Sequence, residues 1–251
     1  MDPIHTQIAT SDTSSITVRG KDLVNDLIGE RGFTETLYFL VCHRFPTAGE
    51  TRILDACLVT LMEHGFTPSS IIARLMIDSV PDEMQVAVAG GLLSIGSVFA
   101  GTMEGCARLI QAADGHSDDL AKFCENIVAT HRATKTTLPG FGHPIHKPDD
   151  PRTPKLFTVA EKNGASGRYI ALLKQMSAQF DRLYGRHLTI NATGAIAALL
   201  LEIGFPPDAM RGISVVSRAG GLIGHVQKER ETKSARRIWK LVEENIPYQA
   251  D

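Results

Sequence analysis

The sequence lacks several features that would point directly to a function. Its formal net charge is −2 and its basic residues are scattered except for a group near the C-terminus, so neither nucleic acid nor a membrane is expected as a partner. The first residues are mostly polar, which predicts no secretory signal. The longest apolar run, 86–100, is shorter than the roughly 20 residues of a membrane-spanning helix and is interrupted by glycines and serines.

Motifs for common chemistries are also scarce. No two of the 4 cysteines have C-x-x-C spacing, so reduced, buried thiols are expected, which favours the cytoplasm. A phosphate-binding P-loop and the nucleophile elbow of a Ser-His-Asp hydrolase are both missing. His143, His146, Asp149 and Asp150 are close in sequence, but their spacing fits no zinc signature and no metal is expected.

What the chain does contain is a succession of apolar stripes with helical spacing. Thr34 and Thr47 are suitable N-caps for two of these helices, and only 16–19 reads as a strand. The stretches 86–100 and 192–203 predict helices that are buried on nearly every side. The pattern predicts an all-α fold, with helices over residues 35–44, 48–62, 86–100, 103–112, 115–135, 154–162, 168–184, 192–203, 208–224 and 229–244.

The stretch 138–152 carries most of the functional signal. Gly140 and Gly142 let the backbone approach a ligand closely, while several prolines stiffen the loop. The loop presents His143, whose imidazole can move protons, and Arg152, whose guanidinium can bind an anion. We expect it to bind something anionic or to transfer protons; the alternative is a surface connection in which proline and glycine only mark turns.

Three further polar residues stand in or beside apolar segments. His64 follows an amphipathic helix, where it is either a ligand contact or a partner of the helix dipole. Glu104 follows a very apolar stretch, where a desolvated carboxylate would suit general acid or base work, whereas a glutamate at a helix start also suits solvent. Arg218 lies in an apolar segment, and a buried arginine normally has an anion from the protein or from a ligand.

Taken together, these segments resemble the citrate synthase family, including its short citryl-CoA lyase branch, over nearly the whole chain. The most specific match is residues 140–143 (Gly-Phe-Gly-His) followed by 150–152 (Asp-Pro-Arg), which are similar to the family's GxGHxVxxxxDPR loop. Residues 63–65 (Glu-His-Gly) and 217–219 (Ser-Arg-Ala) resemble two further family motifs, and 16–20 (Ile-Thr-Val-Arg-Gly) resembles its opening strand.

The resemblance implies an all-α, citrate synthase-like fold with a large domain, 1–112 and 191–251, and a smaller domain, 113–190, inserted into it. It implies a homodimer or larger homo-oligomer, in which the small domain closes over the ligands. Those ligands would be a keto-acid and an acyl-CoA, with the coenzyme A thioester as a substrate and no permanently bound cofactor. The implied reaction makes or breaks the carbon–carbon bond between acetyl-CoA and oxaloacetate.

The resemblance also assigns roles to single residues. His143 would be the acid or base at the carbonyl or hydroxyl oxygen of the oxo-acid, which His64, Arg152 and Arg218 would hold. Arg237 lies where the family has an arginine that reaches into the neighbouring subunit's site. Coenzyme A is expected against Pro139, Gly140, Gly142 and Arg186, the last of which equally suits a solvated helix end.

Two positions depart from the family pattern. Glu104 stands where citrate synthases carry a histidine that citryl-CoA lyases also lack, which favours the lyase branch. Thr193, expected in the substrate site, stands where the family has the aspartate that moves the methyl proton, and a threonine hydroxyl cannot serve as that base. Either Glu104 takes over this proton transfer, or a different acyl-CoA and keto-acid react, or the chain binds such ligands without turnover. A helical scaffold that binds no small ligand is a further alternative.

Overall fold

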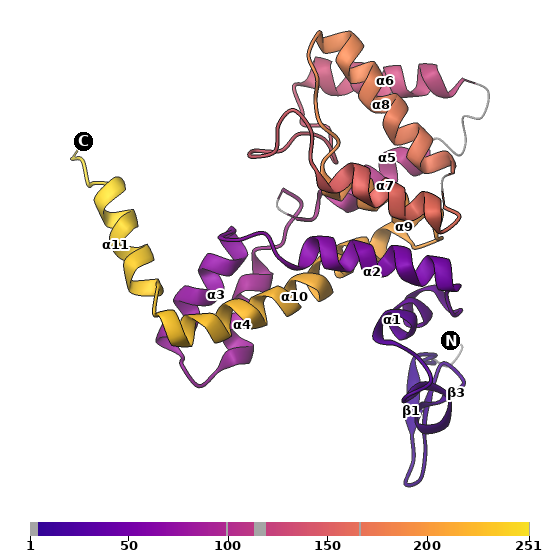
Figure 1. Ribbon diagram of the computed structural model, residues 1–251, viewed down its shortest axis with the longest axis vertical. Helices are drawn as coiled ribbons and strands as arrows, with labels where there is room; N and C mark the ends of the chain where they lie inside the picture. Colours follow the sequence, from indigo (N-terminus) through magenta and orange to yellow (C-terminus); the bar gives the residue numbers. More distant parts are fainter. Residues whose placement is uncertain (1–4, 99, 113–118, 166, 251) are drawn as a thin grey trace.

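A computed structural model describes residues 5–98, 100–112, 119–165 and 167–250 (Figure 1). Within these ranges the chain is mostly helical, as the sequence predicts. The helices are α1 (Phe33–Cys42), α2 (Ala48–Met62), α3 (Pro68–Ser79), α4 (Met84–Leu93), α5 (Thr102–Gln111), α6 (Leu120–Thr134), α7 (Arg152–Lys162), α8 (Arg168–Tyr184), α9 (Ala192–Glu202), α10 (Pro207–Thr232) and α11 (Ala235–Asn245).

A small antiparallel sheet precedes the helices. It has the order β1 (Ala9–Ser11), β2 (Ile16–Val18) and β3 (Lys21–Asp22), and a π-helical turn (Leu23–Leu27) follows it. The predicted strand is β2. Its two neighbours were not predicted, because β1 and β3 are short and mostly polar and show no alternation of apolar residues.

One of the two N-caps predicted from the sequence is present in the structure. Thr47 caps α2 as predicted: its hydroxyl accepts from the Glu50 amide at 3.2 Å, and the Glu50 carboxylate accepts from the Thr47 amide at 2.7 Å. The prediction that Thr34 caps α1 is wrong. That helix begins two residues earlier than expected, at Phe33, and the Gly32 amide donates to the Glu35 carboxylate at 2.9 Å in place of a side-chain cap.

The main hydrophobic core is built around α9. Every residue from Ala192 to Leu201 except Thr193 is buried, which confirms the prediction for this helix. Helices α5, α7 and α8 pack directly on α9, α2 contacts both α7 and α9, and α6 packs on α8. Burying each leucine or isoleucine of α9 contributes roughly 1.5–3 kcal/mol, so this helix holds the layers together.

A second, smaller core lies where α3, α4 and the C-terminal half of α10 meet. Gly91 makes this packing close, because a Cβ atom there would lie 2.6 Å from the Ser69 carbonyl oxygen. The helix predicted over 86–100 ends at Leu93, whose side chain is 87% exposed. The expectation that this helix is buried on every side is wrong, because only one narrow face of it contacts α3 and α10.

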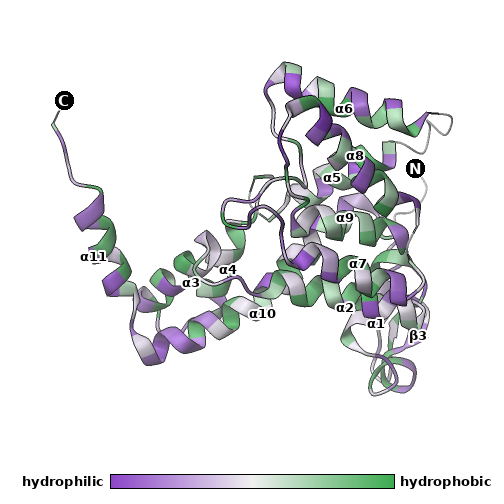
Figure 2. Ribbon diagram, turned by 45° about the horizontal axis from the view of Figure 1, so that its top comes forward, coloured by the Kyte–Doolittle hydropathy of each residue, from purple (hydrophilic) through white to green (hydrophobic). Residues whose placement is uncertain are grey.

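The end of the chain also differs from the expected pattern. Helices were expected over 208–224 and 229–244, but α10 runs without a break to Thr232 and ends at Lys233, whose φ is +50°. The glycines near 224 do not interrupt it, because the hydrogen bonds of the helix continue past them. Helix α11 then extends away from the rest of the chain, with hydrophobic residues alternating along it (Figures 1 and 2).

The domain boundaries expected at about residues 112 and 190 stay predictions. In the described residues, α6, α7 and α8 share one hydrophobic core with α2 and α9. Part of the helix expected over 115–135, residues 115–118, lies outside the described residues, as does residue 99 of the 86–100 stretch. No helix among the described residues combines the length and apolar character needed to cross a bilayer.

Candidate active site

The loop between α6 and α7 lies against the N-terminal end of α9. The Gly142 amide donates to the Thr189 carbonyl at 2.8 Å, and the Asn191 amide donates to the Gly140 carbonyl at 3.1 Å. Gly140 has a φ of +85°, and a Cβ atom there would lie 2.5 Å from the Cys106 Sγ. Only glycine fits at this position, so the sequence Gly-Phe-Gly fixes the loop that presents His143.

His143 is held in one tautomer by its own loop. Its Nδ1 accepts from the amides of Ile145 at 3.1 Å and His146 at 3.0 Å, so the neutral ring carries its proton on Nε2. Burial, His146 and Arg152 together lower the pKa of His143, which keeps the ring neutral near pH 7. His143 therefore presents an N–H donor at Nε2.

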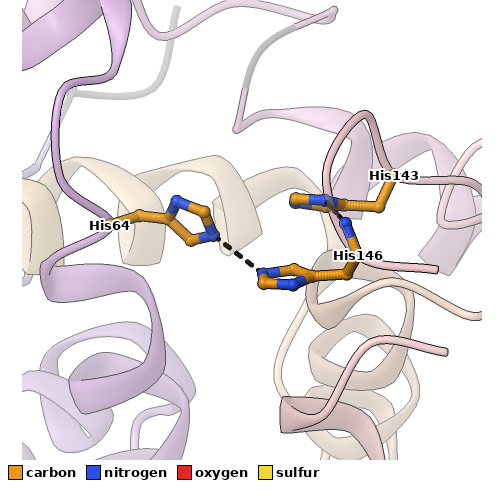
Figure 3. A group of neighbouring side chains, drawn as sticks. All are labelled: His64, His143 and His146. Atoms are coloured by element: carbon orange, nitrogen blue, oxygen red, sulfur yellow. Dashed lines mark hydrogen bonds between the residues drawn. The ribbon is translucent and has the colours of Figure 1, made fainter.

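Three imidazoles meet at this point (Figure 3). His64, from the loop between α2 and α3, has its Nε2 3.2 Å from the Nε2 of His146, and the rings of His143 and His146 stack at 4.4 Å. The three side chains lie close enough to hold a metal ion. The chemistry argues against this, because the Nε2 of His143 carries a proton and has the guanidinium of Arg152 3.3 Å away.

Arg152 is positioned by Asp150. Its Nε and Nη2 donate to the two oxygens of the buried Asp150 carboxylate at 2.9 and 2.7 Å, and the Ala192 amide donates to the same carboxylate at 3.0 Å. Burial raises the pKa of Asp150, but the hydrogen bonds from Arg152 and Ala192 outweigh it, so the pKa is lowered and the carboxylate stays charged. This pairing aims the remaining N–H groups of Arg152 towards His143.

Arg218 projects from α10 and is 8% exposed. Its Nη1 is buried and has no hydrogen-bond partner in the part of the chain that the structure describes. Burial lowers the pKa of Arg218; the charge of Glu63 opposes this shift and that of Arg152 adds to it. A buried guanidinium with a free N–H beside a second guanidinium favours an anionic ligand that brings its own acceptors.

The structure thus brings His64, His143, Arg152 and Arg218 into one region from three distant parts of the sequence. The rings of His64 and His143 are 5.6 Å apart, Arg152 adjoins His143, and Arg218 interacts electrostatically with Arg152 and with Glu63, the residue before His64. These groups are all hydrogen-bond donors or can become donors. Together they suit a small acid with more than one carboxylate and a carbonyl or hydroxyl oxygen.

Glu104 does not have the surroundings that the sequence suggested. Its carboxylate lies 3.1 Å from Arg108 and 3.0 Å from Arg211, in the first turn of α5. The carboxylate is partly desolvated, as expected, since the side chain is 21% exposed, but its neighbours are two guanidinium groups and not the apolar pocket that was expected. Arg211 could not be foreseen as its partner, since it lies more than a hundred residues further along the chain.

The hydroxyl of Thr193 is engaged in two hydrogen bonds. The hydroxyl donates to the Asn191 side-chain oxygen at 2.7 Å and lies 2.7 Å from the hydroxyl of Thr102 on α5. It therefore joins α9 to α5 at the edge of the site. Among the described residues, the hydrogen-bond partners of the Thr193 hydroxyl include no carboxylate.

The remaining predicted residues are spread more widely. Pro139 packs on α5, where a Cβ atom at Gly105 would lie 3.4 Å from its ring. Arg186 is exposed just after the end of α8. Arg237 is exposed on α11, which points away from the site within one chain (Figure 1).

Sequence reasoning missed the positioning groups around the site. Asp150 belongs to the Asp-Pro-Arg motif and is a weak metal-ligand candidate in the sequence, but its pairing with Arg152 two residues later was not predicted. Glu63 accepts from the His64 amide at 2.8 Å and so fixes the loop that carries His64. The only local signal in each case was a carboxylate one or two residues before a site residue.

These donors form a candidate anion-binding site in a mostly helical fold. The sequence profile described as "Citrate synthase, C-terminal domain" matches residues 42–241, and the chain belongs to the citrate synthase family. The structure of citryl-CoA lyase from Hydrogenobacter thermophilus superposes with a TM-score of 0.88 and 30% sequence identity, covering 99% of this chain and 95% of that one.

Two further relatives extend the comparison. ATP citrate lyase from Methanosaeta concilii, as a mutant in complex with (3S)-citryl-CoA, superposes with a TM-score of 0.83 and 20% identity over 99% of this chain and 42% of that chain, which shows the shared fold. The 2-methylcitrate synthase of Shewanella oneidensis is 27% identical over 187 residues, which is 74% of this chain and 48% of that protein. The chain spans about half the length, or less, of the curated relatives it matches.

Proposed function

We propose that the chain makes or breaks the carbon–carbon bond between an acyl-CoA and a keto-acid. The favoured reaction is the cleavage of citryl-CoA to acetyl-CoA and oxaloacetate, or the reverse condensation with hydrolysis. The observation that carries the proposal is the convergence of the His143 Nε2, the free Nη1 of Arg218 and the Arg152 guanidinium on one region. The likeness to citryl-CoA lyase over nearly the full length of both chains supports the lyase direction.

In this proposal the oxo-acid lies against these donors. Arg152 and Arg218 bind its carboxylates, and His64 contributes a further hydrogen bond. The Nε2–H of His143 donates to the ketone oxygen and stabilises the negative charge that develops there as the new bond forms. In cleavage the hydroxyl proton of citryl-CoA passes to solvent, and the same Nε2–H stabilises the resulting alkoxide until the carbon–carbon bond breaks and the ketone forms. The neutral state of His143 suits this role, because a hydrogen-bond donor without full charge needs no counter-ion in the free site.

The proton transfer at the acetyl methyl carbon is the open step. Glu104 is the candidate, and its pairs with Arg108 and Arg211 would have to loosen when the thioester binds. Glu104→Gln should then abolish turnover and leave oxo-acid binding intact. Asp208→Asn is the matched control, because exposed Asp208 also pairs with Arg108 but does not contact Glu104. Retained turnover in Glu104→Gln would remove Glu104 from the mechanism.

The alternative function is a diverged relative that binds a keto-acid, an acyl-CoA or both without turnover. The observation that favours it is Thr193, whose hydroxyl is engaged by Asn191 and Thr102 and cannot act as a base. Exchange of the acetyl-CoA methyl protons, followed by NMR with and without oxaloacetate, separates the two functions. Exchange requires a working base, whereas a binder shows affinity alone.

A thermal-shift matrix of keto-acids against acyl-CoAs tests the proposal most directly. A ligand at 100 times its Kd should stabilise the folded state by about 2.7 kcal/mol, and the matched pair should stabilise it more than either partner. Arg218→Gln should lose the keto-acid shift, while Arg230→Gln, further along the same helix, should keep it. No shift with oxaloacetate, citrate or CoA would instead favour a helical scaffold without a small ligand.

We further propose a homodimer, or a larger homo-oligomer, in the cytoplasm. Arg237 on the projecting α11 would reach the partner's site, and the small domain would close over the ligands. The coenzyme A thioester would lie against Pro139, Gly140 and Gly142, with Arg186 near its phosphates. Sedimentation equilibrium tests the oligomer, and Arg237→Gln should weaken citryl-CoA binding without changing the oligomeric mass.

A further inference from the structure

His225 lies two turns after Arg218 on the same face of α10, and its side chain is 11% exposed. Its Nδ1 accepts from the Nε of Arg74 at 2.9 Å. Because arginine can only donate, the proton of the neutral His225 ring is on Nε2. That Nε2 lies 3.0 Å from the carboxylate of Glu63. The His225 ring therefore accepts a hydrogen bond from Arg74 at Nδ1 and donates one to Glu63 from Nε2.

On one side, the contacts of His225 continue to the start of α11. Arg74, from α3, is almost fully buried, and its Nη1 lies 2.7 Å from the equally buried carboxylate of Glu229. That carboxylate also accepts from the hydroxyl of Ser234 and, at 2.6 Å, from the amide of Ala235. Burial raises the pKa of Glu229, but Ser234, Ala235 and Arg74 outweigh it, so the pKa is lowered. The first residue of α11 is thus bonded to the same network.

On the other side, the contacts continue into the candidate site. Glu63 accepts from the amides of His64 and Gly65, so its carboxylate fixes the backbone that carries the His64 ring. Its charge also opposes the effect of burial on Arg218. Gly221 permits this arrangement, because a Cβ atom there would lie within 1.9 Å of the Met62 carbonyl oxygen. The end of α2 and the middle of α10 are therefore in direct contact at Glu63.

We infer that His225 is a positioning residue: the series Glu229, Arg74, His225 and Glu63 holds the His64 loop in its binding geometry and ties it to the start of α11. The role is indirect, since His225 acts through Glu63 and contacts no reacting atom. Loss of the His225 contact frees the Glu63 carboxylate, which then no longer fixes the amides of His64 and Gly65. The consequence for substrate rests on the function proposed above, whereas the consequence for the His64 ring does not.

Two substitutions of His225 separate the contacts. In His225→Asn the side-chain oxygen can still accept from Arg74, so the buried guanidinium keeps its partner, but the shorter side chain does not reach Glu63. In His225→Gln the amide can donate to Glu63 and accept from Arg74. Arg230→Gln is the matched control, because Arg230 on the same helix bonds only the Pro81 carbonyl, at 2.9 Å, among the contacts of the described residues.

The first measurement is steady-state cleavage of citryl-CoA. We expect His225→Asn to raise KM about tenfold with kcat changed by less than about threefold, because the positioning of bound substrate is lost and the chemistry is not. His225→Gln should recover most of the wild-type KM, and Arg230→Gln should match the wild type. Equal losses in all three variants, or no rescue by glutamine, would overturn the inference in favour of a purely structural role.

The second measurement needs no ligand. In protein labelled with 15N-histidine, the wild type should show His225 protonated on Nε2 and not on Nδ1, and His225→Asn should shift the His64 ring resonances while Arg230→Gln leaves them in place. If the wild type has no lyase activity but these shifts occur, the proposed function fails and the positioning role stands. A His64 spectrum unchanged by His225→Asn would refute the positioning role whatever the activity.

Discussion

Asp150 accepts four N–H hydrogen bonds, and its replacement by asparagine tests how the site is held together. One oxygen accepts from the amide and Nε of Arg152 at 3.1 and 2.9 Å, and the other accepts from its Nη2 at 2.7 Å and from the Ala192 amide at 3.0 Å. Asparagine has one acceptor oxygen. Whichever way its amide is turned, the NH₂ group faces two donors and Arg152 loses its counter-charge.

The size of the effect follows from these contacts. Each hydrogen bond to a charged group contributes roughly 1.5–3 kcal/mol, and breaking a buried ion pair costs about 3–5 kcal/mol. Asp150 is fully buried, but the Arg152 side chain is 25% exposed, so water compensates part of the loss. We therefore expect Asp150→Asn to lower the free energy of unfolding by about 3 kcal/mol, a large part of the roughly 5–15 kcal/mol typical of a folded protein.

Urea denaturation followed by circular dichroism, at fixed protein concentration, measures this change. The midpoint should fall with an unchanged m-value. Asp149→Asn is the matched control: that carboxylate is 70% exposed and lies 3.0 Å from His187, so its loss should cost roughly 0.2–1 kcal/mol. If Asp150→Asn proved no less stable than Asp149→Asn, the reasoning from the four donors would be refuted.

Three further outcomes follow from the site. His143→Ala should reduce turnover by roughly 10²–10⁴-fold, with little change in the thermal shift from CoA, as single-turnover and thermal-shift assays would show. The pKa of His143 is lowered from 6.5 in the folded state. Its contribution to the free energy of unfolding should therefore fall as the pH drops below about 6.5 and level off below the folded-state pKa. A urea midpoint that stays flat between pH 7 and 5 would contradict this. Gly140→Ala should destabilise the protein by more than about 2 kcal/mol, because its Cβ would clash with Cys106, whereas Gly164→Ala, with a similar positive φ and no neighbour within 4 Å, should cost about 1 kcal/mol. Equal urea midpoints for the two glycine variants would exclude the clash.

The helical elements were largely predictable, because apolar spacing and caps act within a few residues. Thr47 and the apolar run of α9 predicted their helices correctly. The errors occurred where local signals were ambiguous. Two helices were expected over 208–224 and 229–244 where α10 runs without a break, and an apolar run past Leu93 suggested a longer buried helix. The C-terminal half of α10 packs on α3 and α4, and such contacts between distant segments leave no local signal in the sequence.

In the candidate site, too, the features that depend on nearby residues were predictable and those that depend on distant residues were not. The loop motif identified His143 and Arg152, because Gly-Phe-Gly-His and Asp-Pro-Arg are contiguous and chemically distinctive. The tautomer of His143 also follows from its own loop, since the donors to Nδ1 are only two and three residues away. The pairing of Glu104 with Arg211 was not predictable, because no local pattern records which distant side chain will face a carboxylate.

The amino-acid order alone determined most of the helices, the positions of the imidazoles and guanidiniums along the chain, and the glycines that shape the loop. The packing of α2, α3 and α10 decided which of those charges face one another: Glu63 with His225, Arg74 with Glu229, and Arg218 with no acceptor from the described chain. The physical reason is range. Helix formation depends on neighbours within about four residues, whereas a charge inside a protein depends on every group that the fold places around it.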